Sequence, residues 1–369
     1  GRRNLIINGA MQVAQRGTSS TDSGYYTLDR FSCTYSGTDE NPTQAQADVA
    51  SGTTPYTNGF RKSYKVTNGN QTSGAGATDW VWFRYLFEAQ DIANSGWNYV
   101  SSSSYVTLSF WIKSSVAQTF KGYLRSRDGT EQRYAFETGS LTADTWTKIV
   151  KTIPGNSNLQ FDNDANQGFQ LNILGFMGTD YTDNSVTEDV WAAYASGTRM
   201  KDNTSTWYTT NDATLEITGF QLELGSQATP FEHRSFDEEI RLCQRYYNKS
   251  LPYSFAPQQA IPSTDPTDTD VDGYLGWAMY TTTSCRSPYF QYPVEMRATP
   301  TVTIYSSARV SSPTDNRLAL YNGGSWLNTG TSAANPNTKR VAFNGTVSSG
   351  LTQFGVYLFG GGFDCDAEI

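Results

Sequence analysis

Hydrophobic and polar residues alternate at the end of the segment 214–224, which predicts a strand. Phe220, Leu222 and Leu224 fall on one side of an extended chain, and Gln221 and Glu223 fall on the other. This period of two is typical of a strand with one buried face.

A helix is predicted a few residues later. Ser235 and Glu238 form a capping box, in which each side chain satisfies a backbone donor of the first turn. Apolar residues then recur at helical spacing: Phe236, Ile240, Cys243 and Tyr247. The pair Leu251-Pro252 ends this pattern, so the chain has one predicted helix between two parts that are rich in strands.

Short strand patterns dominate both parts. Residues 105–112 alternate cleanly, whereas residues 80–87 are apolar at nearly every position, as in a central strand covered on both faces. Further strands are predicted at residues 121–126, 133–137, 146–154, 169–176, 341–344 and 354–359, and at the end of the segment 289–305. Strands that are separated by Gly, Asn and Asp turns, without crossover helices, predict antiparallel β-sandwiches.

The length of 369 residues suits two domains and a connector. We therefore expect an all-β architecture with a first sandwich at residues 1–232, a connector helix at 233–250 and a C-terminal β-sandwich tip domain at 251–369. Only 17% of residues are charged while 14% are aromatic, a balance typical of extracellular or virion β-structure.

The charge pattern limits the partners. The net charge is −8 and Lys and Arg form no run, which argues against nucleic acid and against an anionic membrane surface. No apolar run approaches the roughly 20 residues that span a bilayer, so membrane insertion is not expected. The chain begins GRRN, without a Met and without the apolar segment of a signal peptide, and we expect a fragment or a processed product.

The four cysteines are scattered, no two form a CxxC pair, and the chain has one histidine. This composition argues against a zinc site. Single cysteines in strands and in one helix are typical of buried thiols, as in a protein assembled in a reducing cytoplasm, although disulfides stay open as an alternative.

Several motifs occur in an order that resembles a known family. They are residues 4–11 (NLIINGAM), 109–114 (SFWIKS), Trp146 with 153–155 (IPG), and 219–225 (GFQLELG) with 229–231 (TPF). Together they resemble the carbohydrate-binding-module-like jelly roll of bacteriophage tail fibres and related virion proteins. Residues 236–247 are similar to the helix that commonly follows this module, and residues 293–300 (PVEMRATP) resemble a phrase that recurs in phage fibre tips.

The resemblance implies a jelly roll for residues 1–232 and a place in the virion, in the tail fibre, after assembly in the host cytoplasm. Other virion tail proteins are the implied partners. Such modules also serve as structural spacers, so the resemblance leaves open whether this copy binds sugar.

Two aromatic pairs are candidates for carbohydrate binding. In the C-terminal part, Tyr321, Asn322 and Trp326 surround a Gly-Gly turn in a polar loop region. An aromatic ring offers a flat apolar face to a pyranose, and a nearby amide pairs with its hydroxyl groups. Trp97 and Tyr99, which follow Ser-Gly in the first part, form the competing site.

One segment has the spacing of a calcium ligand set. Asp268, Asp270 and Asp272 begin a D-x-D-x-D-G sequence, in which alternate carboxylates converge on a hard cation. The twelfth position is Met279 instead of Glu, so a complete EF-hand loop is absent. An acidic linker that binds no calcium is the simpler interpretation.

Catalytic motifs are lacking. A Ser-His-Asp arrangement would have to use His233, which lies in the connector. Glycoside hydrolysis needs two carboxylates, for which Glu88 with Asp91 and Asp162 with Asp164 are candidates, yet such residues more commonly form turns or solvated faces. We therefore predict that the chain is not an enzyme.

These observations lead to one functional prediction and two alternatives. The prediction is a phage tail-fibre receptor-binding protein that attaches the virion to host-surface polysaccharide or lipopolysaccharide. A homotrimer is expected, because Leu242 and Tyr246 give the helix a second apolar face to bury. The alternatives are a structural spacer or capsid decoration protein, and a glycan depolymerase.

Overall fold

The computed structural model describes residues 3–258, 275–279, 281–307, 317–321, 325–328, 332–347, 351–353 and 355–369. The chain forms two compact units. The first unit contains Gly1–Ala14, Thr18–Glu239 and Ile369, and the second contains Gln15–Gly17 and Ile240–Glu368. Strands dominate both units, which confirms the predicted all-β fold class.

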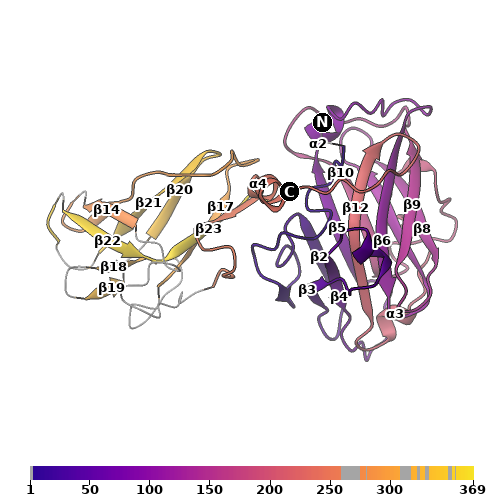
Figure 1. Ribbon diagram of the computed structural model, residues 1–369, viewed down its shortest axis with the longest axis horizontal. Coiled ribbons are helices and arrows are strands. Elements are labelled where there is room, and N and C mark those ends of the chain that lie inside the picture. The colour runs from indigo at the N-terminus through magenta and orange to yellow at the C-terminus, as the bar shows by residue number, and fades with distance from the viewer. Residues whose placement is uncertain are drawn as a thin grey trace. The chain divides into compact units, whose positions relative to one another are not determined.

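The first unit is a jelly-roll sandwich of two six-stranded antiparallel sheets (Figure 1). The first sheet has the order β1 (Ser19–Ser20), β3 (Thr43–Asp48), β4 (Lys62–Thr67), β12 (Thr214–Leu224), β6 (Tyr105–Ser114) and β9 (Thr147–Pro154). The second has the order β11 (Trp191–Ala193), β8 (Gln132–Ser140), β7 (Thr119–Ser126), β10 (Gln167–Met177), β5 (Trp80–Glu88) and β2 (Phe31–Ser36).

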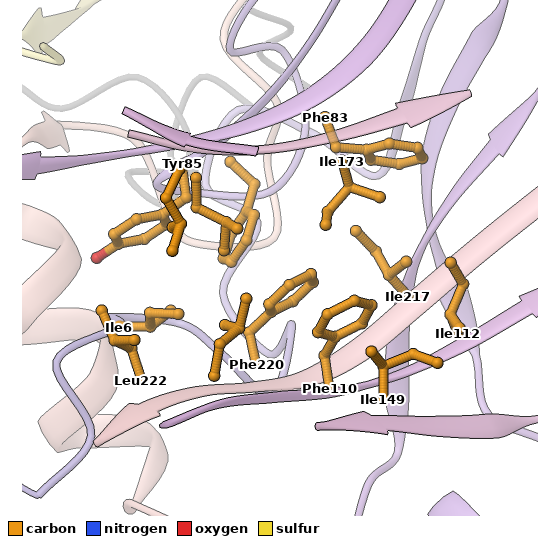
Figure 2. Packing of buried hydrophobic residues seen from close by; sticks show 14 of the residues in the cluster. Ile6, Phe83, Tyr85, Phe110, Ile112, Ile149, Ile173, Ile217, Phe220 and Leu222 are labelled. Carbon is orange, nitrogen blue, oxygen red and sulfur yellow. The ribbon is translucent and has the colours of Figure 1, made fainter. Parts of the chain in front are cut away.

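The core of the first unit lies between its two sheets. Figure 2 shows Phe83, Tyr85 and Ile173 of the second sheet pointing toward Phe110 and Phe220 of the first. The rings of Phe110 and Phe220 stack with their centres 4.7 Å apart. Each such side chain contributes about 1.5–3 kcal/mol when it is fully buried. The alternation at residues 105–112 is confirmed, because the apolar residues of that strand belong to this core.

Strand β5 is covered on both faces, as predicted. Val81, Phe83 and Tyr85 belong to the core between the sheets. Trp82 belongs to a second apolar cluster on the other side of the sheet, with Leu174 of β10. The outer side of the second sheet is therefore partly buried as well.

Two of the short motifs, residues 4–11 and 219–225, contact each other in the structure. The Asn4 amide nitrogen donates to the carbonyl of Phe220 at 2.9 Å, and its oxygen accepts from the backbone amides of Ile6 at 3.0 Å and Leu222 at 3.1 Å. Gly9 lies against the same strand, since a Cβ there would be 2.2 Å from the carbonyl oxygen of Phe220. These motif residues join the N-terminal segment to β12.

Arg234 holds the same segment through a buried ion-pair network in which its side chain is 6% exposed. The guanidinium donates to Glu232 at 2.9 Å and to the Asn4 carbonyl at 2.6 Å, and it lies 3.4 Å from Glu239. Burial of Glu232 disfavours its ionised form, but backbone donors of Asn4 and Arg3, together with Arg234, outweigh this effect and lower the pKa of Glu232.

Helix α4 spans Phe236–Gln244, and the division between the units falls within it. The Ser235 hydroxyl accepts from the Glu238 backbone amide at 3.2 Å, which confirms the predicted N-cap. The predicted extent is wrong at the C-terminal end, because Tyr247 pairs with Asp366 in a strand instead of continuing the helical stripe. Phe236 is 40% exposed and is not part of a buried stripe.

Three short helices were not predicted: α1 (Thr54–Thr57), α2 (Ala89–Ala93) and α3 (Thr206–Thr209). Each has only four or five residues, too few to show a helical period in the sequence. No helix in the described residues has the length and apolar character needed to cross a bilayer.

The second unit also consists of antiparallel strands. A three-stranded sheet has the order β13 (Tyr247–Lys249), β23 (Gly362–Asp366) and β17 (Thr301–Tyr305). A larger sheet has the order β16 (Phe290–Gln291), β21 (Arg340–Thr346), β15 (Ser284–Arg286), β14 (Leu275–Met279), β22 (Val356–Gly360), β18 (Ala319–Tyr321) and β19 (Trp326–Asn328), with β20 (Ser332–Pro336) pairing to β21. The core of the second unit includes Ile304, Leu320, Phe343 and Phe363.

Asp364 is a buried carboxyl group in the core of the second unit. It accepts hydrogen bonds from the hydroxyl groups of Tyr247 at 2.8 Å and Tyr305 at 2.7 Å. Burial raises the pKa of Asp364, although these two hydrogen bonds oppose the shift.

We expect the stability of the second unit to fall as the pH rises through the folded-state pKa of Asp364. Because that pKa is raised above its ordinary 3.8, the folded unit binds the proton more tightly than the unfolded chain does. This contribution is complete below the ordinary pKa and is lost above the raised one. Urea unfolding at a series of pH values gives the free energy of unfolding at each pH. This free energy should change less with pH in Asp364→Asn than in the original protein.

The control for this measurement is Asp48→Asn, which changes a carboxylate that is 83% exposed. This variant should keep the pH dependence of the original protein. The same pH dependence of the free energy of unfolding in the original protein and in Asp364→Asn would contradict the expectation.

All four cysteines are buried thiols, as predicted: Cys33, Cys243, Cys285 and Cys365. Burial raises the pKa of Cys33 to about 12, of Cys285 to about 11 and of Cys365 to about 12. At neutral pH these groups are therefore protonated and unreactive.

Candidate functional site

The outer side of the second sheet carries a row of polar side chains. Antiparallel register places Arg84 of β5 beside Asn172 of β10, and Asn172 beside Tyr123 of β7. Gln170 and Arg125 form the next row. Alternate residues of these strands fill the core between the sheets, so this row faces away from it.

We name this surface the polar face and define it by nine residues of the second sheet. They are Thr34, Trp80, Trp82, Arg84, Tyr123, Arg125, Arg133, Gln170 and Asn172.

The polar face contains buried polar atoms that have no hydrogen-bond partner among the described residues. They are Arg84 Nε, Tyr123 Oη, Arg133 Nη1, Gln170 Oε1 and Asn172 Oδ1, with Arg199 Nε from a segment that covers the face. A buried polar group without a partner costs about 1–3 kcal/mol. Such groups are rare in folded proteins, and their concentration on one surface indicates that water or a polar ligand binds there.

Two tryptophans stand beside these polar groups. The rings of Trp80 and Trp82 have centres 5.0 Å apart. Trp82 is 7% exposed, its indole nitrogen donates to the Thr34 hydroxyl, and the Arg84 guanidinium lies 4.1 Å from its ring centre. Trp80 is only half-buried, so it offers ring surface to a ligand.

A strap formed by residues 178–204 extends over the β7 and β8 side of the polar face. Glu188 of the strap pairs with Lys121 at 2.9 Å, and the Thr198 carbonyl accepts from Arg133 Nε at 2.8 Å. The strap brings three further side chains to the face: Tyr181, Tyr194 and Arg199. Aromatic rings, amides and guanidinium groups are thus gathered on one side of the first unit.

The predicted pair Trp97 and Tyr99 lies elsewhere in the first unit. Trp97 is 4% exposed, donates from its indole nitrogen to the Ser104 carbonyl at 3.3 Å, and lies 6.4 Å from Phe161 between ring centres. Tyr99 is half-buried with its ring 4.9 Å from Phe161. Trp97 is therefore a core residue with little ring surface for a sugar. Tyr99 has more exposed surface than Trp97.

The predicted pair Tyr321 and Trp326 is brought together in the second unit. They are cross-strand partners in β18 and β19, and their ring centres are 5.3 Å apart. Both are half-buried. Asn322 lies outside the described residues, so the complete predicted site stays a prediction.

The predicted calcium ligands Asp268, Asp270 and Asp272 also lie outside the described residues. Among the residues that are described, no group of three or more His, Cys, Asp or Glu side chains is arranged to hold a metal ion.

The carboxylates considered for hydrolysis have structural contacts. Glu88 is buried at the end of β5 and accepts from the Gln90 side chain, and Asp164 accepts from a backbone amide two residues further on at 2.9 Å. His233 belongs to the first unit, where its Nε2 lies 2.9 Å from the Asn58 carbonyl.

A separate hollow of about 390 Å³ lies at the β11 edge of the second sheet. Trp191 and the amides of Gln132, Asn158 and Gln160 are among the side chains that line it. The Trp191 ring is 5.3 Å from Tyr134 and is half-buried. This hollow is a second place in the first unit where an aromatic ring and amides meet.

No protein-family model and no curated protein matches the sequence. Solved structures of low similarity include the N-terminal cellulose-binding domain from Cellulomonas fimi β-1,4-glucanase C, at 10% identity and a TM-score of 0.28, covering 59% of this chain and 99% of that chain. The family 11 carbohydrate-binding module from Clostridium thermocellum with a mixed-linked tetrasaccharide matches at 10% identity and a TM-score of 0.25, covering 58% and 98%.

The tandem CBM22-1–CBM22-2 domain from Paenibacillus barcinonensis Xyn10C matches at 11% identity and a TM-score of 0.28, covering 98% of this chain and 97% of that chain. At these identities and TM-scores, the similarity assigns neither a family nor a ligand to this chain.

Proposed function

We propose that the first unit binds glycan on the polar face. The observation that carries this proposal is the set of buried, unpaired polar atoms beside a half-buried tryptophan. A sugar ring has an apolar C–H side and a rim of hydroxyl groups that both donate and accept hydrogen bonds. Trp80 suits the former, and the half-buried guanidinium groups of Arg84 and Arg125 suit the latter, whereas the amides of Gln170 and Asn172 are buried.

The wider function that we propose is attachment of a phage virion to host-surface glycan, without catalysis. The motifs at residues 4–11, 109–114, 219–231 and 293–300 support it through their resemblance to tail-fibre proteins. The virion location and the homotrimer rest on the same resemblance. The second apolar helix face predicted for the homotrimer is reduced to Leu242, because Tyr246 lies beyond α4 and is buried within one chain. Light scattering would test the homotrimer against the 40.8 kDa mass of one chain.

Trp80→Ala is expected to weaken glycan binding about tenfold, because a stacked aromatic ring contributes roughly 1 kcal/mol or more beyond its buried area. A glycan array first identifies a ligand for the unmodified protein, and calorimetry with that ligand then measures the affinity of each variant. Trp146→Ala is the matched control. Trp146 is also half-buried, but it lies beside the first sheet, where Lys113 is 5.2 Å from its ring centre.

Three outcomes would contradict a site on the polar face, and the first two would place it elsewhere. Loss of binding only in Trp326→Ala would assign it to the second unit, as the sequence predicts. Loss only in Gln160→Ala would assign it to the hollow beside Trp191. Unchanged affinity in Trp80→Ala, with the fold retained, would contradict the proposal for the polar face.

A further inference from the structure

Two guanidinium groups lie beside the same tryptophan on the polar face. The Cζ atom of Arg84 is 4.1 Å from the centre of the Trp82 ring, and that of Arg199 is 5.7 Å from it. Arg199 is also 4.7 Å from the Tyr181 ring centre. Both arginines are half-buried, so part of each side chain remains accessible from solvent.

Neither arginine forms an ion pair with a carboxylate in the described part of the chain. The Nε atom of each is buried there without a hydrogen-bond partner, and Arg199 makes one long contact to the Met177 sulfur at 3.9 Å. Burial lowers the pKa of the Arg84 guanidinium, and the neighbouring charge of Arg199 adds to this effect. Two like charges are therefore held close together in a partly desolvated place.

Two carboxylates near the polar face, Glu131 and Glu188, already have other cationic partners. Glu131 pairs with Arg125, and Glu188 pairs with Lys121 at 2.9 Å and Lys201 at 3.6 Å. The whole chain has 35 acidic and 27 basic residues, so carboxylates are not scarce. Partly buried charges are normally paired, and Arg84 and Arg199 have no carboxylate partner among the described residues.

We propose that the glycan bound by the polar face is acidic and that Arg84 and Arg199 bind its anionic group. The forked guanidinium matches a carboxylate or a phosphate oxyanion with paired hydrogen bonds between opposite charges, whereas a neutral hydroxyl offers it neither the paired geometry nor an opposite charge. The inference rests on the proposed glycan binding and adds the chemical class of the ligand, a sugar that carries a carboxylate or phosphate group. Because the overall charge of −8 repels anions, attraction of an acidic ligand has to come from this local pair of cations.

The test compares acidic polysaccharides with neutral forms of the same backbone, using the full chain. The probes are polygalacturonate and its carboxyl-reduced form, and phosphorylated mannan and its dephosphorylated form. We expect about tenfold tighter binding to at least one acidic form, with an advantage that shrinks as salt is added. Preference for polygalacturonate identifies a carboxylate as the anion, and preference for phosphorylated mannan identifies a phosphate.

Arg84→Gln and Arg199→Gln should each remove most of this preference, because the affinity for the acidic form should fall much more than the affinity for the neutral form. Arg61→Gln is the matched control, because Arg61 also lies over an aromatic ring, 3.9 Å from the centre of Tyr56, but away from the polar face. The salt titration of the unmodified protein gives an independent measurement if one variant folds poorly.

Equal affinity for the acidic and neutral forms would overturn the inference and leave the proposed glycan binding intact. A preference for the acidic form that survives both substitutions would also overturn it. Failure to bind any glycan, in a folded protein, would overturn the proposed function itself.

Discussion

Replacing Arg234 with methionine is expected to lower the free energy of unfolding of the first unit by about 3–5 kcal/mol. The guanidinium is buried between Glu232 and Glu239 and also donates to the Asn4 and Ile6 carbonyls. Methionine has a similar length but no charge, so the change leaves the buried carboxylate of Glu239 and the half-buried carboxylate of Glu232 without this partner. Removal of one member of a buried ion pair is costly for this reason, even where the pair itself adds little net stability.

The control is Lys62→Met, which breaks an exposed ion pair. Lys62 lies 2.6 Å from Asp48, and the two side chains are 37% and 83% exposed. Solvent screens such a pair, so the loss should stay below about 1 kcal/mol. Denaturant unfolding followed by tryptophan fluorescence measures both variants. Equal losses for Arg234→Met and Lys62→Met would contradict the role given to the buried network.

Asn4→Ala should also destabilise the first unit, by about 3 kcal/mol. The substitution removes one side chain but leaves three buried backbone groups without a partner: the Phe220 carbonyl and the Ile6 and Leu222 amides. Each unpaired buried group costs about 1–3 kcal/mol, and water entry recovers part of the total. The midpoint of chemical denaturation gives the measurement.

Asn94→Ala serves as the comparison, because Asn94 uses its amide in exposed hydrogen bonds to the Gln90 carbonyl at 2.9 Å and to Asn163 at 2.7 Å. Water replaces these bonds, so a loss below about 1 kcal/mol is expected. A small effect of Asn4→Ala, similar to that of Asn94→Ala, would show that the N-terminal segment contributes little to the sandwich.

Local alternation in the sequence predicted the strands well, and the structure explains why. Along residues 105–112 each second side chain enters the core between the sheets, so the period of two records which face meets the other sheet, although Thr107 and Ser109 on the opposite face are buried as well. The helix was predicted less well at its end. Tyr247 fits the helical stripe, but its backbone pairs with Asp366, a residue more than a hundred positions away, and such long-range pairing leaves no local pattern.

The polar face could have been found only in part. The polar residues Arg84, Gln170 and Asn172 interrupt strands that are otherwise apolar, and this signal is visible in the sequence. Their meeting with Tyr123 depends on the register of three strands that are far apart along the chain. The burial of Trp97 likewise has no local signal, because Phe161, whose ring centre is 6.4 Å from that of Trp97, is more than sixty positions away.

The four buried cysteines allow the opening of each unit to be followed without any engineered label. Cys33 belongs to the first unit, and Cys243, Cys285 and Cys365 belong to the second. Because a thiol reacts with an alkylating reagent only as an accessible thiolate, modification of each cysteine must wait for local opening. Timed alkylation followed by peptide mass spectrometry would therefore give separate opening rates for the two units in a single sample.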